Sequence, residues 1–342
     1  MINDMEYIKG SLAELNMQMV NLKKRKDQLM KKADEIAVEA GALEQRDYFS
    51  GGSYARYLQM MAEKREPVAA PRVVYQGEPG AYSEMACRKF FGSAIRPQGL
   101  YDFEDTFLAL AEGRADYAVL PIENSSTGAI RQVYDLLEQY HYFFVGETTV
   151  KIEHALMALP GTEIEDITHV YSHEQGIFQC EKFLKQYPQW KRIPQADTAG
   201  SAKMVAETEN PHAAAICSTL AAEIYGLNIL REGINANRNN TTRFVVVSPK
   251  AEIRREKRDK VCIALTTAHN SGALHNVLTV FAVHGINLVR LESRPIPERR
   301  WEYMFFLEFT GDLMTPEIDS VIHEISLMSE DLRVLGNFKS NL

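Results

Sequence analysis

Between Arg72 and about residue 250, short runs rich in β-branched residues alternate with amphipathic helical patterns. The expected strands are 73–76, 117–120, 142–150, 167–171, 213–217 and 244–247, and the expected helices are 82–91, 103–112, 128–140, 176–186 and 199–208. This alternation predicts an α/β fold. The stretch is long enough for two lobes, and ligands in such folds bind at the carboxyl ends of strands.

A different order of elements follows the charged stretch 254–260. The pattern predicts strand 261–267, helix 272–283, strands 286–294 and 301–309, helix 316–328 and strand 332–335. This βαββαβ order is typical of ferredoxin-like domains. We therefore expect residues 255–342 to form a separate compact domain.

Residues 1–70 form a third, helical segment. Apolar residues alternate at four- and three-residue steps from Ile8 to Ile36, with Lys26 as a polar exception. This spacing predicts one long helix that packs lengthwise on a partner. Gly41 and Ser50–Ser53 interrupt the pattern, a second helix is expected over 54–66, and the proline-containing residues 67–71 act as a linker.

Composition narrows the classes of partner. The chain has 342 residues and a formal net charge of −8, which disfavours nucleic-acid binding. No apolar run reaches the ~18 residues of a membrane span, and residues 1–9 lack the apolar core of a secretory signal. We therefore expect a cytoplasmic location and a small-molecule partner.

Cysteine spacing disfavours metal and redox chemistry. The four cysteines contain no C-x-x-C pair, so a zinc knuckle, a redox pair or a disulfide framework is not indicated. We expect buried, reduced thiols at Cys87, Cys180, Cys217 and Cys262. No metal cage and no Ser/His/Asp triad stand out.

Four polar clusters lie where expected strands give way to turns or helices, or at a strand entrance: 77–84, 121–128, 171–175 and 239–244. Each has an ordinary structural alternative, such as a plain turn, a helix cap or a surface ion pair. Together they offer hydroxyls, amides and the guanidinium of Arg243, which suit a small acidic ligand.

Three motifs within these clusters resemble the signatures of prephenate dehydratases. They are Pro121-Ile122-Glu123-Asn124, Ser172-His173-x-Gln175 and Thr242-Arg243-Phe244. The resemblance implies a two-lobed catalytic domain over 72–250, similar to periplasmic binding proteins. It also implies conversion of prephenate to phenylpyruvate, carbon dioxide and water without a cofactor or a metal.

The resemblance assigns roles residue by residue. Thr242 would donate a hydrogen bond to the leaving hydroxyl, since a threonine is too weak an acid to release its proton. Arg243 would bind a carboxylate or order the loop. The implied catalytic residues are Thr242, Glu123, Asn124 and Gln175, and the implied substrate contacts are Ser126, Thr127, Thr241, Arg243, Phe244, Ser83 and Tyr82. These roles require the first and third motifs to lie together.

The third domain carries two motifs similar to those with which the ACT regulatory domain of this family binds phenylalanine. They are Gly272-Ala273-Leu274 at a helix start and Glu292-Ser293-Arg294-Pro295 at a strand end. The resemblance implies L-phenylalanine as a feedback effector bound between paired ACT domains. Exposed strand edges and the heptad helix favour a homodimer or homotetramer.

Residues 7–36 resemble the first helix of a chorismate mutase domain. Lys9 and Lys26 fall where the family has arginines, and an ammonium group does not reproduce the bidentate guanidinium. We interpret 1–70 as a shortened, degenerate mutase-like segment. The alternatives are a bifunctional mutase/dehydratase, an arogenate dehydratase and a non-catalytic two-lobed sensor of small acids.

Overall fold

The computed structural model describes residues 25, 66–252, 257–296 and 299–341. They divide into a two-lobed unit, Arg65–Lys257 with Phe338–Leu342, and a βαββαβ unit, Arg258–Asn337. The predicted helices over 8–36 and 54–66 lie outside the described residues, apart from Arg25 and Glu66. Among the described residues, no helix is both long and apolar enough to cross a membrane.

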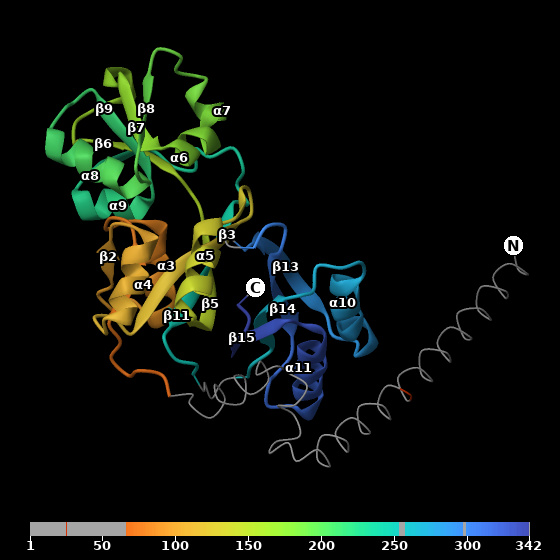
Figure 1. Cartoon of the computed structure of the whole chain (residues 1–342). Coiled ribbons are helices and arrows are strands. Elements are labelled where there is room, and N and C mark those ends of the chain that lie inside the picture. The colour runs from red at the N-terminus through yellow and green to blue at the C-terminus, as the bar shows by residue number, and fades with distance from the viewer. Residues whose placement is uncertain (1–24, 26–65, 253–256, 297–298, 342) are drawn as a thin grey trace, which may run out of the picture. The chain divides into compact units, whose positions relative to one another are not determined.

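Lobe 1 of the two-lobed unit is a mixed sheet in the order β2-β1-β3-β11-β5, with β4 paired to β3. Figure 1 labels β2, β3, β5 and β11 of this sheet. Strand β1 is parallel to β2 and β3, while β11 is antiparallel to β3 and β5. Its strands are β1 (Val73–Gln76), β2 (Gln98–Leu100), β3 (Tyr117–Asn124), β4 (Gly128–Ala129), β5 (Phe143–Lys151) and β11 (Thr241–Ser248).

Three helices cover lobe 1: α3 (Tyr82–Phe91), α4 (Phe103–Ala111) and α5 (Arg131–Tyr140). The chain steps from β1 out to β2 and then back past β1 to β3. Because both crossovers follow the right-handed rule, α3 and α4 lie on opposite faces. The direction reverses between β1 and β3, so the carboxyl ends of these two strands open a crevice where ligands bind in such sheets.

Lobe 2 repeats this logic in the order β10-β6-β9-β7-β8. Strand β7 is parallel to β8 and β9, and the order reverses between β7 and β9. The strands are β6 (Ala155–Ala158), β7 (His169–His173), β8 (Lys191–Gln195), β9 (Ala213–Cys217) and β10 (Asn228–Arg231), and the helices are η1 (Ile164–Asp166), α6 (Glu174–Gln179), α7 (Glu181–Leu184), α8 (Thr198–Thr208) and α9 (Thr219–Tyr225).

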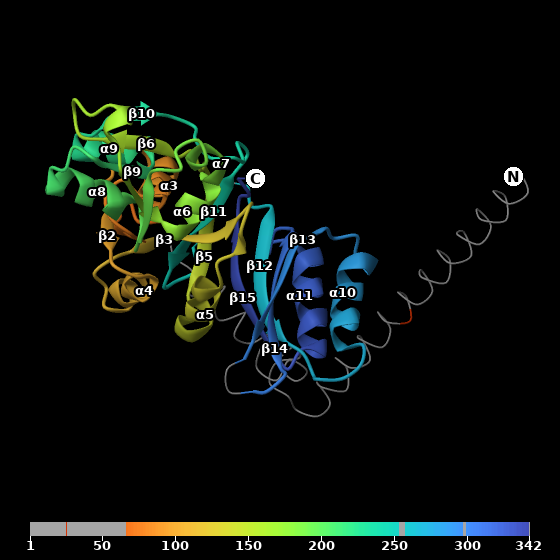
Figure 2. The ribbon, with the colours of Figure 1, turned by 90° about the horizontal axis from the view of Figure 1, so that it is seen from above.

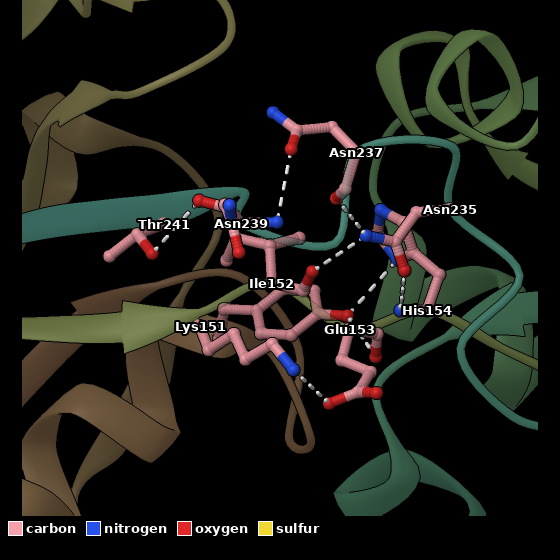
Figure 3. A network of polar contacts seen from close by, with 9 residues as sticks. Lys151, Ile152, Glu153, His154, Asn235, Asn237, Asn239 and Thr241 are labelled. Atoms are coloured by element: carbon pink, nitrogen blue, oxygen red, sulfur yellow. Dashed lines mark hydrogen bonds and ion pairs between the residues drawn. The ribbon is translucent and has the colours of Figure 1, made fainter.

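Two connections join the lobes, one from β5 to β6 and one from β10 to β11. Asn235 ties them together: its Oδ1 accepts from the backbone N of His154 at 3.2 Å and its Nδ2 donates to the carbonyl of Ile152 at 3.1 Å (Figure 3). Asn235 is buried. The side chain therefore fastens both connections at the level of the crevice.

The βαββαβ unit has a four-stranded sheet in the order β13-β14-β12-β15. Helices α10 and α11 lie side by side against it (Figure 2). The elements are β12 (Lys260–Thr266), α10 (Ala273–Val283), β13 (Leu288–Pro295), β14 (Tyr303–Thr310), α11 (Pro316–Met328) and β15 (Asp331–Phe338). This confirms the predicted element order.

The structure departs from the predicted elements in two places that matter for the site. Residues 121–124 continue strand β3, and helix α5 begins only at Arg131, so this cluster forms a strand end and turn instead of a helix start. Residues 241–243 are part of β11. Residues 338–341 group with the two-lobed unit.

Candidate functional site

Strand pairing brings together the motifs at 121–124 and 242–244. In the β3–β11 ladder Thr242 is the partner of Asn124 and Arg243 is the partner of Glu123. The amide Nδ2 of Asn124 donates to the hydroxyl Oγ1 of Thr242 at 2.9 Å. The required proximity of the two motifs is therefore present, and it lies at the carboxyl end of β3.

Hydrogen bonds fix the orientation of the Asn124 side chain. Its Oδ1 accepts from the backbone N atoms of Ser126 and Thr127, at 2.9 and 3.2 Å, and from the Thr127 hydroxyl at 3.4 Å. Its Nδ2 also donates to Oδ1 of Asn240 at 2.8 Å. The turn after β3 thus orients the side-chain amide of Asn124 toward Thr242.

A chain of polar contacts continues from this pair into lobe 2. Nδ2 of Asn240 donates to Oε1 of Gln179 at 3.1 Å, and Nε2 of His154 donates to the same oxygen at 2.9 Å. The hydroxyl of Tyr82 lies 3.0 Å from Nδ1 of His154 and 2.9 Å from the carbonyl O of Glu153. One network therefore links α3, both interlobe connections, α6 and the motif pair.

Burial controls the protonation of two members of this network. Desolvation lowers the pKa of His154, which favours the neutral ring. Desolvation also raises the pKa of Tyr82 well above its ordinary value. Both groups are therefore uncharged near neutral pH, and the network contains neutral donors and acceptors.

Arg243 faces away from Thr242. Successive side chains of a strand point to opposite faces, and Phe244, like Thr242, lies on the α3 side, in the core with Ala86 and Cys87. The Nε of Arg243 lies 3.1 Å from Oε2 of Glu147, and its Nη1 lies 4.0 Å from Oε2 of Glu123. The arginine is thus neutralised by the protein's own carboxylates, which favours an ordering role.

The other predicted substrate contacts have mixed positions. The Ser126 hydroxyl donates to Oδ1 of Asn240 at 3.2 Å and so joins the network. The Thr241 hydroxyl donates to the carbonyl of Asn239 at 3.3 Å. Ser83 is buried in the first turn of α3, and Phe244 is a core residue, 2% exposed. Ligand contact by Ser83 or Phe244 stays a prediction.

Gln175 makes no hydrogen bond to the network, whereas Gln179, which the motif did not include, is part of it. Gln175 is exposed, and its backbone N donates to Nδ1 of His173, the N-cap of α6. Gln179 lies one helical turn further and meets Asn240 and His154. A second glutamine at i+4 was the available signal, because such residues share a helix face.

A hollow of about 960 Å³ separates the lobes beside the first polar cluster. Lobe 1 contributes Gln76–Pro79 and Gln98–Tyr101, and lobe 2 contributes Gln195–Asp197 and Lys203. Nζ of Lys203 pairs with Glu78 across it at 3.2 Å. A second hollow, of about 580 Å³, includes Tyr82 and therefore adjoins the network.

The four cysteines are buried, as predicted. Desolvation raises the pKa of Cys180 to about 12 and that of Cys217 to about 11. Across the described ranges, no group of three or more histidine, cysteine, aspartate or glutamate side chains is arranged to hold a metal ion.

In the βαββαβ unit the two predicted effector motifs lie on different elements. Gly272 has φ +87° and caps α10, a conformation that favours glycine. Ala273 and Leu274 line a hollow of about 320 Å³ together with Tyr303 and Phe305. Residues 292–295 lie on β13, an edge strand of the sheet, and they are not among the residues that line this hollow.

Comparison with known proteins decides the family. The sequence profile described as prephenate dehydratase matches residues 73–252, which is more than half of the chain. The chain belongs to the prephenate dehydratase family. A second profile, described as ACT domain, matches residues 267–326. The predicted family and the predicted α/β fold with a C-terminal ACT domain are thereby confirmed.

The similar proteins include bifunctional chorismate mutase/prephenate dehydratases and arogenate dehydratases. The chain is 38% identical to the bifunctional chorismate mutase/prephenate dehydratase of Escherichia coli, over 83% of this chain and 74% of that one. It is 38% identical to arogenate dehydratase 3 of Arabidopsis thaliana, over 79% and 68% of the two chains.

Solved structures share the fold. Prephenate dehydratase from Arthrobacter aurescens in complex with L-Phe has a TM-score of 0.72 and 28% identity, covering 79% of this chain and 90% of that one. The protein GqqA, described as a novel type of quorum quenching acylase, has a TM-score of 0.72 and 30% identity, covering 79% and 98%.

Proposed function

We propose that this member of the prephenate dehydratase family is a carbon–oxygen lyase that converts prephenate to phenylpyruvate, carbon dioxide and water. The observation that carries the proposal is the hydrogen bond from Asn124 to Thr242, which joins two motifs 118 residues apart. A neutral network at the crevice supports it, because neutral donors can receive a doubly anionic substrate.

The geometry supports Thr242 as the donor to the leaving hydroxyl. Its oxygen accepts a hydrogen bond from Asn124, and within the described residues its hydroxyl group donates none. The hydroxyl proton is therefore available to stabilise negative charge as the carbon–oxygen bond breaks. Aromatisation of the ring drives the loss of carbon dioxide in the same step.

Gln179 and Ser126 extend the proposed set. Oε1 of Gln179 is occupied by Asn240 and His154, which leaves its amide N–H groups to face a carboxylate. The roles of Glu123 and Gln175 stay part of the proposal, although the structure gives Gln175 no contact with the motif pair.

L-phenylalanine is the proposed effector, on the ACT match and the Arthrobacter relative in complex with L-Phe. We propose that β13 pairs with the same strand of a second copy, giving a homodimer or a homotetramer. Strand β13 is a sheet edge, and its Val289 and Leu291 are exposed apolar residues. Unpaired edges of this kind favour association.

Turnover assays test the function. Purified protein with prephenate at neutral pH should form phenylpyruvate, and L-phenylalanine should suppress the rate. Thr242→Ala should lower kcat by ~10² or more, the cost of one lost transition-state donor. Full activity in that variant would remove Thr242 from the mechanism.

Parallel assays separate the alternatives. Faster release of phenylalanine from arogenate would identify an arogenate dehydratase. Consumption of chorismate would show a working mutase in residues 1–70, which we propose to be degenerate. Binding of prephenate without turnover would favour the sensor.

A further inference from the structure

Glu147 is a buried carboxylate in the middle of β5 that the proposed catalytic network does not use. It is fully buried, and in the β5–β11 ladder it is the partner of Val245. Its side chain therefore shares a face of the sheet with Arg243, two residues before Val245. Taking a carboxylate out of water is unfavourable unless other groups compensate its charge.

Two separate segments of the chain engage this carboxylate. Oε2 forms an ion pair with Nε of Arg243 at 3.1 Å. Oε1 accepts from the Ser340 hydroxyl at 3.1 Å and from the backbone N of Asn341 at 3.2 Å. The Asn341 side chain also donates to the carbonyl O of Glu147 at 2.6 Å.

Residues 339–341, here called the tether, directly follow β15 of the ACT unit, yet they group with the two-lobed unit. Lys339 and Asn341 are exposed and Ser340 is half-buried. Packing against an apolar surface therefore contributes little to holding the tether. Polar bonds to Glu147 join it to β5.

We propose that Glu147 is a positioning residue for the catalytic strand and that the tether holds it in place. This rests on the proposed dehydratase function. Arg243 directly follows Thr242, so a displaced Arg243 changes the backbone of β11 at the proposed donor. Because the tether continues β15, the last strand of the ACT unit is linked through Glu147 to the position of Thr242.

The kinetic test uses Ser340→Ala/Asn341→Ala and Glu147→Gln. Both should lower kcat about 3- to 30-fold with the KM for prephenate changed less than about twofold, because the strand is displaced while the ligand contacts remain. The tether variant should also raise the phenylalanine concentration for half-inhibition at least about fivefold. Unchanged kcat and effector response in the tether variant overturn the proposal.

Two matched variants control the kinetics. Ser320→Ala removes a serine hydroxyl of α11 that donates to Pro316 at an exposed position, and it should behave as wild type. Two single variants, Ser340→Ala and Ser340→Thr, isolate the hydroxyl group: Ser340→Thr keeps a hydroxyl donor and should retain activity that Ser340→Ala loses. Equal losses in both Ser340 variants would contradict a role for the hydrogen bond.

Hydrogen exchange tests the role of the tether independently of whether prephenate is the substrate. Amides of residues 241–245 should exchange faster in the tether variant than in wild type or Ser320→Ala. Faster exchange supports the tether even if prephenate is not turned over. Unchanged exchange rejects the tether even if prephenate is turned over. Since the tether is at the surface, this variant should remain folded even if Glu147→Gln does not.

Discussion

At the scale of single residues, the site depends on amide orientation. Asn124 uses its oxygen to hold the turn at Ser126 and Thr127 and its nitrogen to reach Thr242 and Asn240. The motifs in the sequence predicted that Asn124 and Thr242 lie close together, and the structure places them in hydrogen-bond contact. The sequence did not identify Gln179, because the partner of a glutamine on α6 depends on how lobe 2 closes on the interlobe connections.

Asn124→Asp tests the orientation of this amide. The substitution places a second acceptor opposite Oδ1 of Asn240, and it draws the Thr242 hydroxyl proton away from the substrate. We expect kcat to fall by ~10² or more. Asn239→Asp adds the same charge at an exposed position of the neighbouring loop and should keep most activity. Comparable kcat values for the two variants would refute the assigned role.

His154 predicts a pH dependence of stability. Burial lowers its pKa, so below about pH 6.5, the ordinary histidine value, the unfolded chain binds this proton more readily than the folded protein. The contribution of neutral His154 is thus present above that pH and is lost as pH falls through the lowered pKa. Urea unfolding between about pH 5 and 8 should show that the free energy of unfolding falls less steeply with decreasing pH in His154→Gln than in wild type. Identical pH dependences of the two proteins would contradict the predicted contribution of His154.

At the scale of elements, the long and strongly patterned segments were predictable. Strands 73–76 and 213–217 and helices 82–91 and 316–328 have the predicted bounds. Strands β2, β6, β8 and β10 were missed for local reasons. Buried Ala155–Ala158 contains no β-branched residue, and β8 contains Pro194, has no buried residue and lies at a sheet edge.

Strand β2 shows why tertiary context decides such cases. It is only three residues long and contains Gly99, where a Cβ would lie 2.3 Å from the carbonyl O of Gly77. The close approach of two backbones requires this glycine. From the sequence alone, the same residues indicate a turn.

Gly80→Ala tests the contact between α9 and the turn before α3. Gly80 has φ +90°, and an added Cβ would lie 2.7 Å from the Cα of Ala221. Gly92→Ala is the matched control, because Gly92 has φ +96° with nothing within 4 Å. Chemical unfolding should show Gly80→Ala to be less stable than the control by at least about 1 kcal/mol. Equal stabilities of Gly80→Ala and Gly92→Ala would contradict the tight contact between Gly80 and Ala221.

At the scale of the whole molecule, the structure describes two units, and the prephenate dehydratase and ACT profiles match the chain in that order. The prediction of a degenerate mutase-like helix over 7–36 falls outside the described residues, apart from Arg25, and depends on Lys9 and Lys26 in place of arginines. The division at 72–250 and 255–342 also stays a prediction. What the sequence could not show is that residues 339–341 return to β5.

Thiol reactivity should report global opening. The pKa of Cys180 is raised to about 12 and that of Cys217 to about 11 by burial, so at pH 8 almost no reactive thiolate forms in the folded protein. Alkylation followed by mass spectrometry should be slow until the denaturant midpoint is reached. Rapid labelling of Cys180 in native buffer would contradict the described packing.

We propose that Asn124 and Thr242 act as one catalytic unit on prephenate. A double-mutant cycle on kcat with Asn124→Ala, Thr242→Ala and the double variant tests it most directly. We expect kcat to fall by ~10² or more in each single variant and to fall little further in the double variant than in the weaker of the two single variants. Losses that multiply, or a Thr242→Ala variant that turns over prephenate at the wild-type rate, would contradict it.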